Sequence, residues 1–397
     1  MLVVTALMIL GLLGGVIAAQ LRALRLGGVI ITPLFAIYFL RSFGTFPLLL
    51  MSVLAGYTSL WIVKRRTMIY GRPLFVIAIV TSSLVPLFVY LLVDAGFGPQ
   101  GIVTELGFIG SVLPGIAAYN FHRLSPDRRV IDAVWSMGLL LFLVVAGIGF
   151  VILVGVTPLS TVTPPVLLGP ESDIARAFGL VVTEASHPVL LPFPAELGML
   201  GLGLFTSEMI RTRWGVRIAG LIVLPLLALF AFRNQWLLPM YGIAAGSAYV
   251  GIQLFHQWTL IYGRVLLSMG VIFGMLTGIS VAPSLPFENG LLPFFTGLLG
   301  GVSAYNVHCI APAERRASVL LSAGAFVVFV AVGRVFLTPF PDGILVEVGI
   351  EHIIGGGIVL AVALREAVRL EMIRSSEFGS ITELEERKDE SRNETSA

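Results

Sequence analysis

Charged residues are scarce in this sequence. Asp, Glu, Lys and Arg together make up 12% of its 397 residues, whereas a soluble domain carries roughly 25%. Hydrophobic residues make up 57%, and apolar runs of about 20 residues, the length that crosses a bilayer, recur along the whole chain. The shortage of charge excludes an ordinary soluble protein, and the runs predict an all-α, polytopic transmembrane helical bundle.

Cysteine is nearly absent, because Cys309 is the only one, which excludes an internal disulfide and a cysteine metal cluster. A net charge of +2 argues against a nucleic-acid surface. The chain has no Walker loop and no histidine pair with metal-ligand spacing, so we expect no metal, no cofactor and no self-contained catalytic residues. Arg22 and Arg25 follow the first apolar segment instead of preceding it, which predicts a retained helix and not a cleaved signal peptide.

The apolar runs predict about thirteen membrane spans. We place them at 2–19, 27–40, 45–63, 73–93, 102–121, 130–154, 194–210, 215–232, 236–254, 262–283, 290–308, 317–337 and 343–364. The 27–40 span is short, which favours a tilted or partly re-entrant element, or a kink at Pro33. The 102–121 span contains Glu105 and Pro114, which favours a broken helix inside the bundle.

Basic residues separate onto one side of this predicted topology. When the loops are assigned alternately to two sides, fifteen Lys and Arg residues gather on one side, and the other holds only Arg41, Arg176 and Arg233, with Arg334 near a helix end. Cytoplasmic loops carry the excess of Lys and Arg. The sequence therefore predicts a multi-pass cell-membrane protein with its amino terminus outside and its carboxyl terminus in the cytoplasm.

The chain contains an internal repeat. The block 67–72 (TMIYGR) recurs at 259–264 (TLIYGR), an offset of 192, and 118–122 (AYNFH) recurs at 304–308 (AYNVH), an offset of 186. Each copy holds six predicted spans, an even number, so the copies enter the membrane in the same orientation, as parallel repeats do.

The repeat defines the predicted domains. They are a first six-helix repeat at 1–154, a Pro-, Thr- and Ser-rich extracytoplasmic linker at 155–193, a second repeat at 194–337, an additional transmembrane helix at 338–365 and a charged cytoplasmic tail at 366–397. In the additional helix, Glu347 and Glu351 are four residues apart, which predicts that they share a helix face, with His352 beside them.

The Tyr-Gly-Arg block lies at the predicted cytoplasmic start of a helix in both repeats, as Tyr70 and Arg72 and again as Tyr262 and Arg264. Two interpretations are open. Tyr at headgroup level and a snorkelling Arg anchor a helix at the membrane surface. Alternatively, the block forms a docking site or contacts a polyanion.

The Tyr-Asn-x-His block ends a predicted helix on the same face. Asn and His are typical of helix carboxyl ends, where they cap the backbone or interact with its dipole. The alternative is that these side chains line the mouth of a conduit or contact a partner. The candidate residues are Tyr119, Asn120, His122, Tyr305, Asn306 and His308.

Two stretches resemble the membrane subunit of poly-γ-glutamate synthesis, the PgsC/CapC family. One is 66–72 followed by an apolar helix, and the other is Glu105 ahead of 110–117 (GSVLPGIA). The resemblance covers 1–154 and, more weakly, 194–337, so the chain looks like two family units fused. It implies a membrane partner of a cytoplasmic ATP-dependent amide ligase which, with an extracytoplasmic subunit, makes and exports a γ-linked glutamate polymer.

Two acids in predicted spans match family glutamates under this resemblance. They are Glu105, whose counterpart in the second repeat is Leu291, and Glu208, whose counterpart in the first repeat is Gln20. A carboxylate in lipid costs several kcal/mol, roughly, unless it is paired, protonated or hydrated. We hypothesise that the two repeats divide roles which identical subunits would share. The alternative is that each acid lies at an interface, exposed to water.

The leading function is a membrane component of a poly-γ-glutamate synthesis and export complex that docks the ligase and guides the polyanion. Arg41 and Arg233, at offset 192, are candidate contacts for that polyanion at the outer face, or ordinary loop arginines. The alternative function is a stand-alone secondary transporter of small organic anions or amino acids. A third, a membrane enzyme acting on a lipid-linked substrate, has no visible nucleophile. A neighbouring ligase gene would favour synthesis.

Overall fold

The computed structural model describes residues 1–95, 107–182, 193–220 and 222–394, the stretch 374–394 by its backbone alone. The described residues form helices and no strand. The first half contains α1 (Leu2–Arg22), α2 (Ile31–Arg41), α3 (Thr45–Arg66), α4 (Arg72–Asp94), α6 (Gly107–His122) and α7 (Pro126–Gly155). The second contains α9 (Phe193–Trp214), α10 (Val223–Arg233), α11 (Leu237–Thr259), α12 (Arg264–Val281), α13 (Leu291–His308) and α14 (Pro312–Phe336). The prediction of an all-helical membrane protein is confirmed, and seven described helices are long and apolar enough to cross a bilayer.

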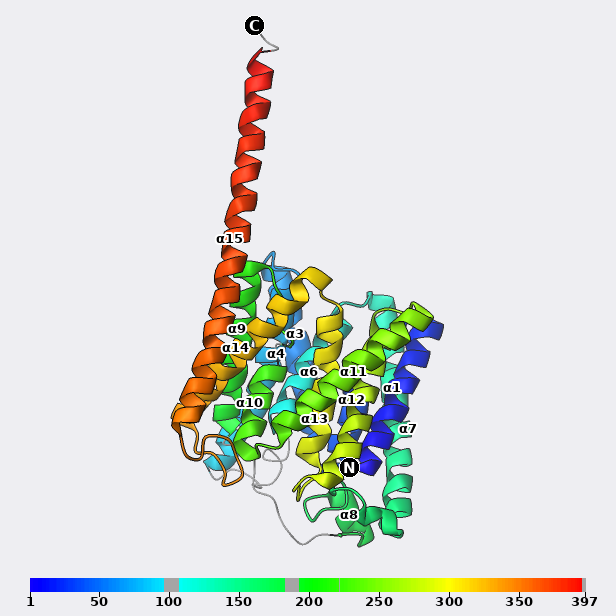
Figure 1. Ribbon diagram of the computed structural model, residues 1–397. Helices are drawn as coiled ribbons and strands as arrows, with labels where there is room; N and C mark the ends of the chain where they lie inside the picture. The colour runs from blue at the N-terminus through cyan, green and yellow to red at the C-terminus, as the bar shows by residue number, and fades with distance from the viewer. Residues whose placement is uncertain (96–106, 183–192, 221, 395–397) are drawn as a thin grey trace.

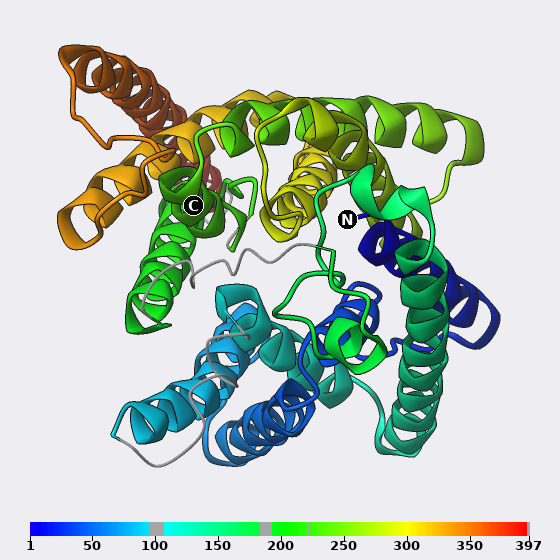
Figure 2. The ribbon, with the colours of Figure 1, turned by 90° about the horizontal axis from the view of Figure 1, so that it is seen from below.

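Each half contains a tightly packed group of three helices. They are α3, α4 and α6 in the first half and α11, α12 and α13 in the second (Figure 2). Glycine permits the close approach at matching positions: a Cβ on Gly115 would lie 2.5 Å from the Ile79 Cα, and one on Gly301 would lie 2.4 Å from the Gly270 carbonyl oxygen. Small residues are how membrane helices bring their backbones together.

The second helix of each half is half-length. α2 and α10 have 11 residues each, about 17 Å of helix against a hydrocarbon core of about 30 Å. The predicted span 27–40 therefore begins as non-helical backbone, and the short length expected for it is confirmed. The predicted continuous span 215–232 is wrong, because its described residues before Val223 lie outside any helix. In both halves an unwound stretch leads into the short helix.

The two halves pack together through their first helices, each of which contacts the other half. α1 packs against α12 of the other half, and α9 packs against α4 and α6. α1 also packs against α7 of its own half, as α9 does against α14. A reciprocal contact of this kind is what two copies of one surface produce when they meet.

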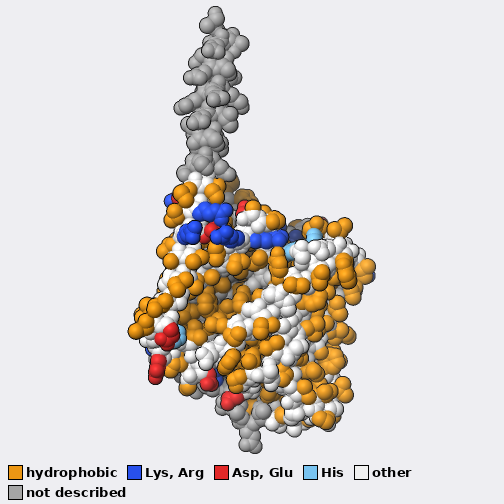
Figure 3. Space-filling model, in the orientation of Figure 1, with side chains coloured by type: hydrophobic (Ala, Val, Ile, Leu, Met, Phe, Trp, Pro, Cys, Tyr) orange, Lys and Arg blue, Asp and Glu red, His pale blue; other side chains and the backbone are white. Residues whose placement is uncertain are grey.

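The last helix, α15 (Ile350–Glu394), runs along α14 and then projects beyond the bundle (Figure 1). Glu347 lies before its first residue, so the prediction that Glu347 and Glu351 share a helix face is wrong. Figure 3 shows Lys and Arg side chains in a band where α15 leaves the bundle, with acidic side chains at the opposite end. Between them the surface shown is largely apolar, as a lipid-facing surface requires. Large apolar side chains such as Phe88 and Val145 are exposed.

Candidate functional site

A single buried carboxylate holds the unwound stretch between α1 and α2. Asp132 of α7 accepts hydrogen bonds from the backbone N–H groups of Arg25 at 2.5 Å, Leu26 at 3.0 Å and Gly27 at 3.4 Å. Irregular backbone persists at membrane depth only where protein satisfies it, and Asp132 is fully buried. The sequence alone gives Asp132 no role, because an acid near the start of a span is also typical of a helix end at the membrane surface.

The second repeat holds its unwound stretch with hydroxyl groups. The Ser322 hydroxyl accepts a hydrogen bond from the Ala219 N–H at 2.8 Å, and the Ser318 hydroxyl donates to the Arg217 carbonyl at 2.5 Å. Ser318 stands at the position of Asp132, at the offset of 186. The two repeats therefore keep one backbone feature but satisfy it with different chemistry, one charged and one neutral.

The asparagines of the Tyr-Asn-x-His block bind these same unwound stretches. The Asn120 side-chain amide donates to the Gly27 carbonyl at 2.9 Å, and the Asn306 amide donates to the Ala219 carbonyl at 2.7 Å. Gly27 and Ala219 correspond at the offset of 192. Each asparagine thus joins its helix to a neighbouring broken element, a structural contact that the predicted helix-capping role does not describe.

Each histidine of that block is the last residue of its helix, and its carbonyl group accepts a hydrogen bond from an arginine of the next helix. In the first repeat, Arg129 donates to the His122 carbonyl at 3.2 Å, to the Leu124 carbonyl at 3.0 Å and to the Tyr57 hydroxyl at 2.8 Å. Arg315 makes the same three contacts in the second repeat, with His308, Ile310 and Tyr249, each at 3.0 Å. The arginine recurs in both repeats, so the sequence could have indicated this set of contacts. The tyrosine partner could not be predicted, because it is distant in the sequence.

The Tyr-Gly-Arg block forms the same turn in both repeats. Gly71 has φ 76° and ψ −131°, and Gly263 has φ 74° and ψ −131°, a conformation essentially confined to glycine. The turn starts α4 and α12 with the arginine as the first helical residue. Tyr70 and Tyr262 are exposed, as an anchor or a docking contact requires. Tyr119 donates to the Gly71 carbonyl at 3.3 Å, and Tyr305 packs beside α11 and α12.

Arg72 forms an ion pair across the two repeats. Its Nε lies 2.6 Å from the Oε1 atom of Glu208 in α9, but the geometry at that oxygen is not that of a hydrogen bond. Glu208 also pairs with Arg211, at 3.1 Å. Arg72 further donates to the Ser207 hydroxyl at 3.2 Å. The first helix of one repeat therefore meets the fourth helix of the other through opposite charges.

The corresponding junction lacks the acid. Arg264 donates to the Leu24 carbonyl at 3.2 Å, and Gln20 stands where the second repeat has Glu208. Among the described residues, no carboxylate lies within ion-pair distance of Arg264. Burial, followed by the charges of Arg264 and Arg123, lowers the pKa of Arg25, while Asp132 raises it. This junction therefore concentrates positive charge, whereas Glu208 offsets the charge of the other.

An apolar cavity of about 310 Å³ lies between the repeats. Corresponding residues of both repeats line it, and Asn120 and Arg264 supply its polar groups. The matched lining pairs are Ile31 with Val223, Leu34 with Leu226, Val112 with Leu298, and Ile116 with Val302. This lining suits an apolar chain and offers little to a string of carboxylates.

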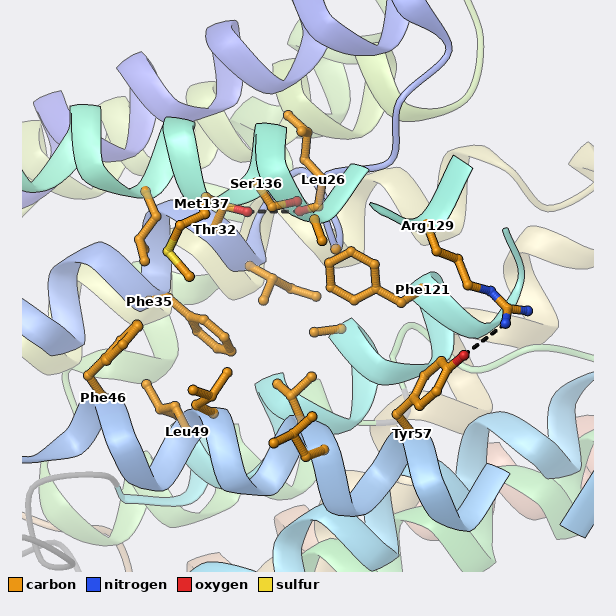
Figure 4. Close-up of a pocket in the computed structure, with 18 of the residues that line it drawn as sticks. Leu26, Thr32, Phe35, Phe46, Leu49, Tyr57, Phe121, Arg129, Ser136 and Met137 are labelled. Atoms are coloured by element: carbon orange, nitrogen blue, oxygen red, sulfur yellow. Dashed lines mark hydrogen bonds between the residues drawn. The ribbon is translucent and has the colours of Figure 1, made fainter. Parts of the chain in front are cut away.

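A second apolar cavity of about 400 Å³ lies between α2, α3 and α7 (Figure 4). Phe35, Phe46 and Leu49 line one end, and the Arg129–Tyr57 hydrogen bond lies at the other. Its form, an apolar groove ending in a cation, suits the acyl chain of a membrane lipid.

Among the described residues, no group of His, Cys, Asp and Glu is placed to hold a metal ion. The predicted site residue Glu105 lies outside the described residues.

A family model described as capsule biosynthesis CapC matches residues 10–130 and again 202–316. The chain belongs to this family. The two matches are consistent with a tandem duplication of the CapC unit, and each includes a Tyr-Gly-Arg block and a Tyr-Asn-x-His block. No curated protein and no solved structure matches the chain.

Replacing Glu208 with Gln in this CapC chain is expected to separate stability from function. The Arg72 and Glu208 side chains are about a quarter exposed, so losing their pair should cost no more than about 1 kcal/mol of unfolding free energy. If the acid serves polymer production, output in cells should fall several-fold at unchanged protein level. The matched control is Gln20→Glu, which adds the acid to the other junction. Undiminished output from Glu208→Gln would contradict a functional role.

Proposed function

We propose that this capsule-biosynthesis membrane protein is the scaffold of a poly-γ-glutamate synthesis and export complex. In this proposal it crosses the membrane as two parallel repeats, with its amino terminus outside and its carboxyl terminus in the cytoplasm. It docks a cytoplasmic ATP-dependent amide ligase and guides the growing polyanion, and an extracytoplasmic subunit completes the complex. The basic band (Figure 3) supports this orientation, because cytoplasmic surfaces carry the excess of Lys and Arg.

The observation that carries the proposal is an unequal distribution of paired cations. At the predicted cytoplasmic face of the second repeat, α15 supplies acids: Glu371 pairs with Arg213 at 2.7 Å, and Glu366 lies 4.0 Å from Arg316 and 2.8 Å from Arg369. In the first repeat, Arg72 pairs with Glu208 of α9, but five other basic residues of the same face have no carboxylate within ion-pair distance among the described residues. They are Lys64, Arg65, Arg66, Arg123 and Arg128.

These unpaired cations provide a surface for an acidic partner. Their side chains are exposed at the end of α3, in the turn between α6 and α7 and in the first turn of α7, beside the junction where Arg25 and Arg264 gather. A ligase whose product carries one carboxylate per residue would release that product next to this surface. Cations at such a face raise the local concentration of a polyanion and speed its encounter.

The apolar lining of the central cavity supports a scaffold more than passage of the polymer through it. A path for a polyanion needs polar or positive walls, and the described lining has Asn120 and Arg264 at one end with apolar side chains elsewhere. A stand-alone anion transporter would place polar groups near mid-membrane. We therefore retain the scaffold as the single proposed function.

The test is capture of the ligase by the full-length chain. We expect the chain, purified from membranes of cells that express both proteins, to retain the ATP-dependent ligase encoded in the same genome. Retention should fall as salt rises from about 0.05 to 0.5 M, because salt screens exposed charges. Cells that lack this chain should make no polymer. Absence of capture at low salt, with polymer production independent of the chain, would overturn the proposal.

A further inference from the structure

An arginine ends each short helix at the predicted outer face, and the two arginines have different partners. Arg41, the last residue of α2, pairs with Glu171 in the segment that follows α7. Arg233, the last residue of α10, lies over the ring of Phe340, 3.9 Å from its centroid, in the segment that follows α14. Each repeat therefore folds its outer segment back onto the arginine, but among the described residues only the first repeat places a carboxylate within ion-pair distance of it.

The Arg233 guanidinium keeps unused hydrogen-bonding capacity. Its Nη1 is buried and, within the part of the chain that the structure describes, has no hydrogen-bond partner and no carboxylate within ion-pair distance. A buried N–H group without an acceptor carries a desolvation cost, and native structures keep few of them. An acceptor from a ligand would remove this cost.

A cavity of about 560 Å³ opens beside this guanidinium. Its polar lining comes from Arg233, Asn234, Glu288, Asn289 and Asp342. The Asn234 Oδ1 accepts the N–H of Trp236 at 2.9 Å, and the Asn289 Oδ1 accepts the N–H of Leu291 at 2.8 Å. Each amide oxygen is thus engaged by backbone, which leaves the amide NH₂ groups as the donors. The same lining therefore holds one cation, two amide donors and two carboxylates.

This mixture of charges selects the ligand. A simple anion would be attracted by Arg233 but repelled by Glu288 and Asp342. A simple cation would be attracted by the two acids but repelled by Arg233. A zwitterion satisfies both, with its carboxylate on Arg233 and its ammonium group among the acids. An α-amino acid carries these two groups on one carbon atom, and cavities of roughly 300–1,000 Å³ are typical of small-molecule sites.

We propose that the cavity beside Arg233 binds an α-amino-acid zwitterion, as presented by the amino-terminal residue of a γ-linked glutamate chain. In such a chain the α-amino and α-carboxylate groups of the first residue are both free, because the linkage uses the side-chain carboxylate. The chain end rests on the proposed function, whereas the zwitterion chemistry rests on the cavity. Free glutamate is the other source of the same chemistry. The site would hold the emerging polymer by its end at the outer face.

The experiment is a binding titration of the full-length protein in lipid nanodiscs. The probes are a γ-linked glutamate trimer, the same trimer acetylated at its α-amine, and free glutamate. We expect the free trimer to bind at least tenfold more tightly than the acetylated one, and Arg233→Gln to weaken its binding at least tenfold. Arg41→Gln, the matched variant whose arginine is already paired with Glu171, should bind as the parent does. Arg233→Lys should keep part of the affinity.

Equal binding by Arg233→Gln, with an unchanged elution profile on size exclusion, would overturn the site. Equal binding of the acetylated trimer would overturn the zwitterion. Binding of free glutamate without the trimer would overturn the chain end and support the zwitterion. Because this assay contains no ligase, a chain that captures the ligase but binds no trimer fails only here. A chain that binds the trimer but captures no ligase fails only the docking proposal.

Discussion

Replacing Asp132 with Ala is expected to lower the free energy of unfolding by about 3 kcal/mol or more. The change removes the acceptor of three backbone N–H groups, and each buried N–H left without an acceptor costs about 1–3 kcal/mol before relaxation and water entry reduce the sum. The measurement is the apparent unfolding transition of the purified protein in one detergent, followed by helix content. The loss should also reduce the amount of folded protein in membranes.

Ser318→Ala is the matched control from the second repeat. It removes a hydroxyl that donates to the Arg217 carbonyl, a loss of about 1 kcal/mol. Asp132→Asn should fall between the two, because an amide oxygen in the place of Oδ1 still accepts from the N–H groups of Arg25 and Leu26, while the NH₂ group faces the Gly27 N–H. If Asp132→Ala were no less stable than Ser318→Ala, the carboxylate would not be what holds the unwound stretch.

The effect of Asp132 should extend to both apolar cavities, because the stretch it holds contributes to each. Leu26 and Gly27 line the cavity between α2, α3 and α7, and Gly28 and Ile31 line the cavity between the repeats. One buried carboxylate therefore positions backbone that lines both the apolar cavity between α2, α3 and α7 and the cavity between the repeats.

The helical class and the repeat could be predicted from the sequence because both depend on local pattern. Apolar runs indicate that a helix is surrounded by lipid. The repeated blocks mark residues such as Gly71 and Asn120, which the same backbone geometry requires in each repeat. The matching turns at Gly71 and Gly263, and the matching amide contacts of Asn120 and Asn306, are the structural counterparts of those blocks.

The half-length helices and the pairing of charges could not be predicted. Hydropathy rates an unwound stretch such as 215–220 as part of an apolar span, because it counts side chains and ignores backbone hydrogen bonds. Asp132 gains its role from a stretch about a hundred residues earlier, and Glu208 from an arginine in the other repeat. Such contacts follow from tertiary packing. The sequence did show that Glu208 has no acidic counterpart, and the structure adds that its pair spans the two repeats.

Reversing two charges at the end of α3 is expected to remove ligase capture. Arg65 and Arg66 are exposed and have no carboxylate partner among the described residues; the corresponding residues of the second repeat are Gln257 and Trp258. An exposed charge pair contributes about 0.2–1 kcal/mol. Arg65→Glu with Arg66→Glu removes two attractions and adds two repulsions, about 2 kcal/mol in all, or a roughly 30-fold loss of capture at low salt.

The matched control is Gln257→Glu with Trp258→Glu, which adds two acids at the corresponding place in the second repeat. If docking uses the first repeat, this control should change capture less than threefold, and Arg65→Gln with Arg66→Gln should give an intermediate loss. Cys309 is exposed just after α13, so an impermeant maleimide that labels it only after permeabilisation confirms that no variant has inverted in the membrane. Equal losses from both pairs of acids would mean that net charge, and not the surface of the first repeat, determines docking.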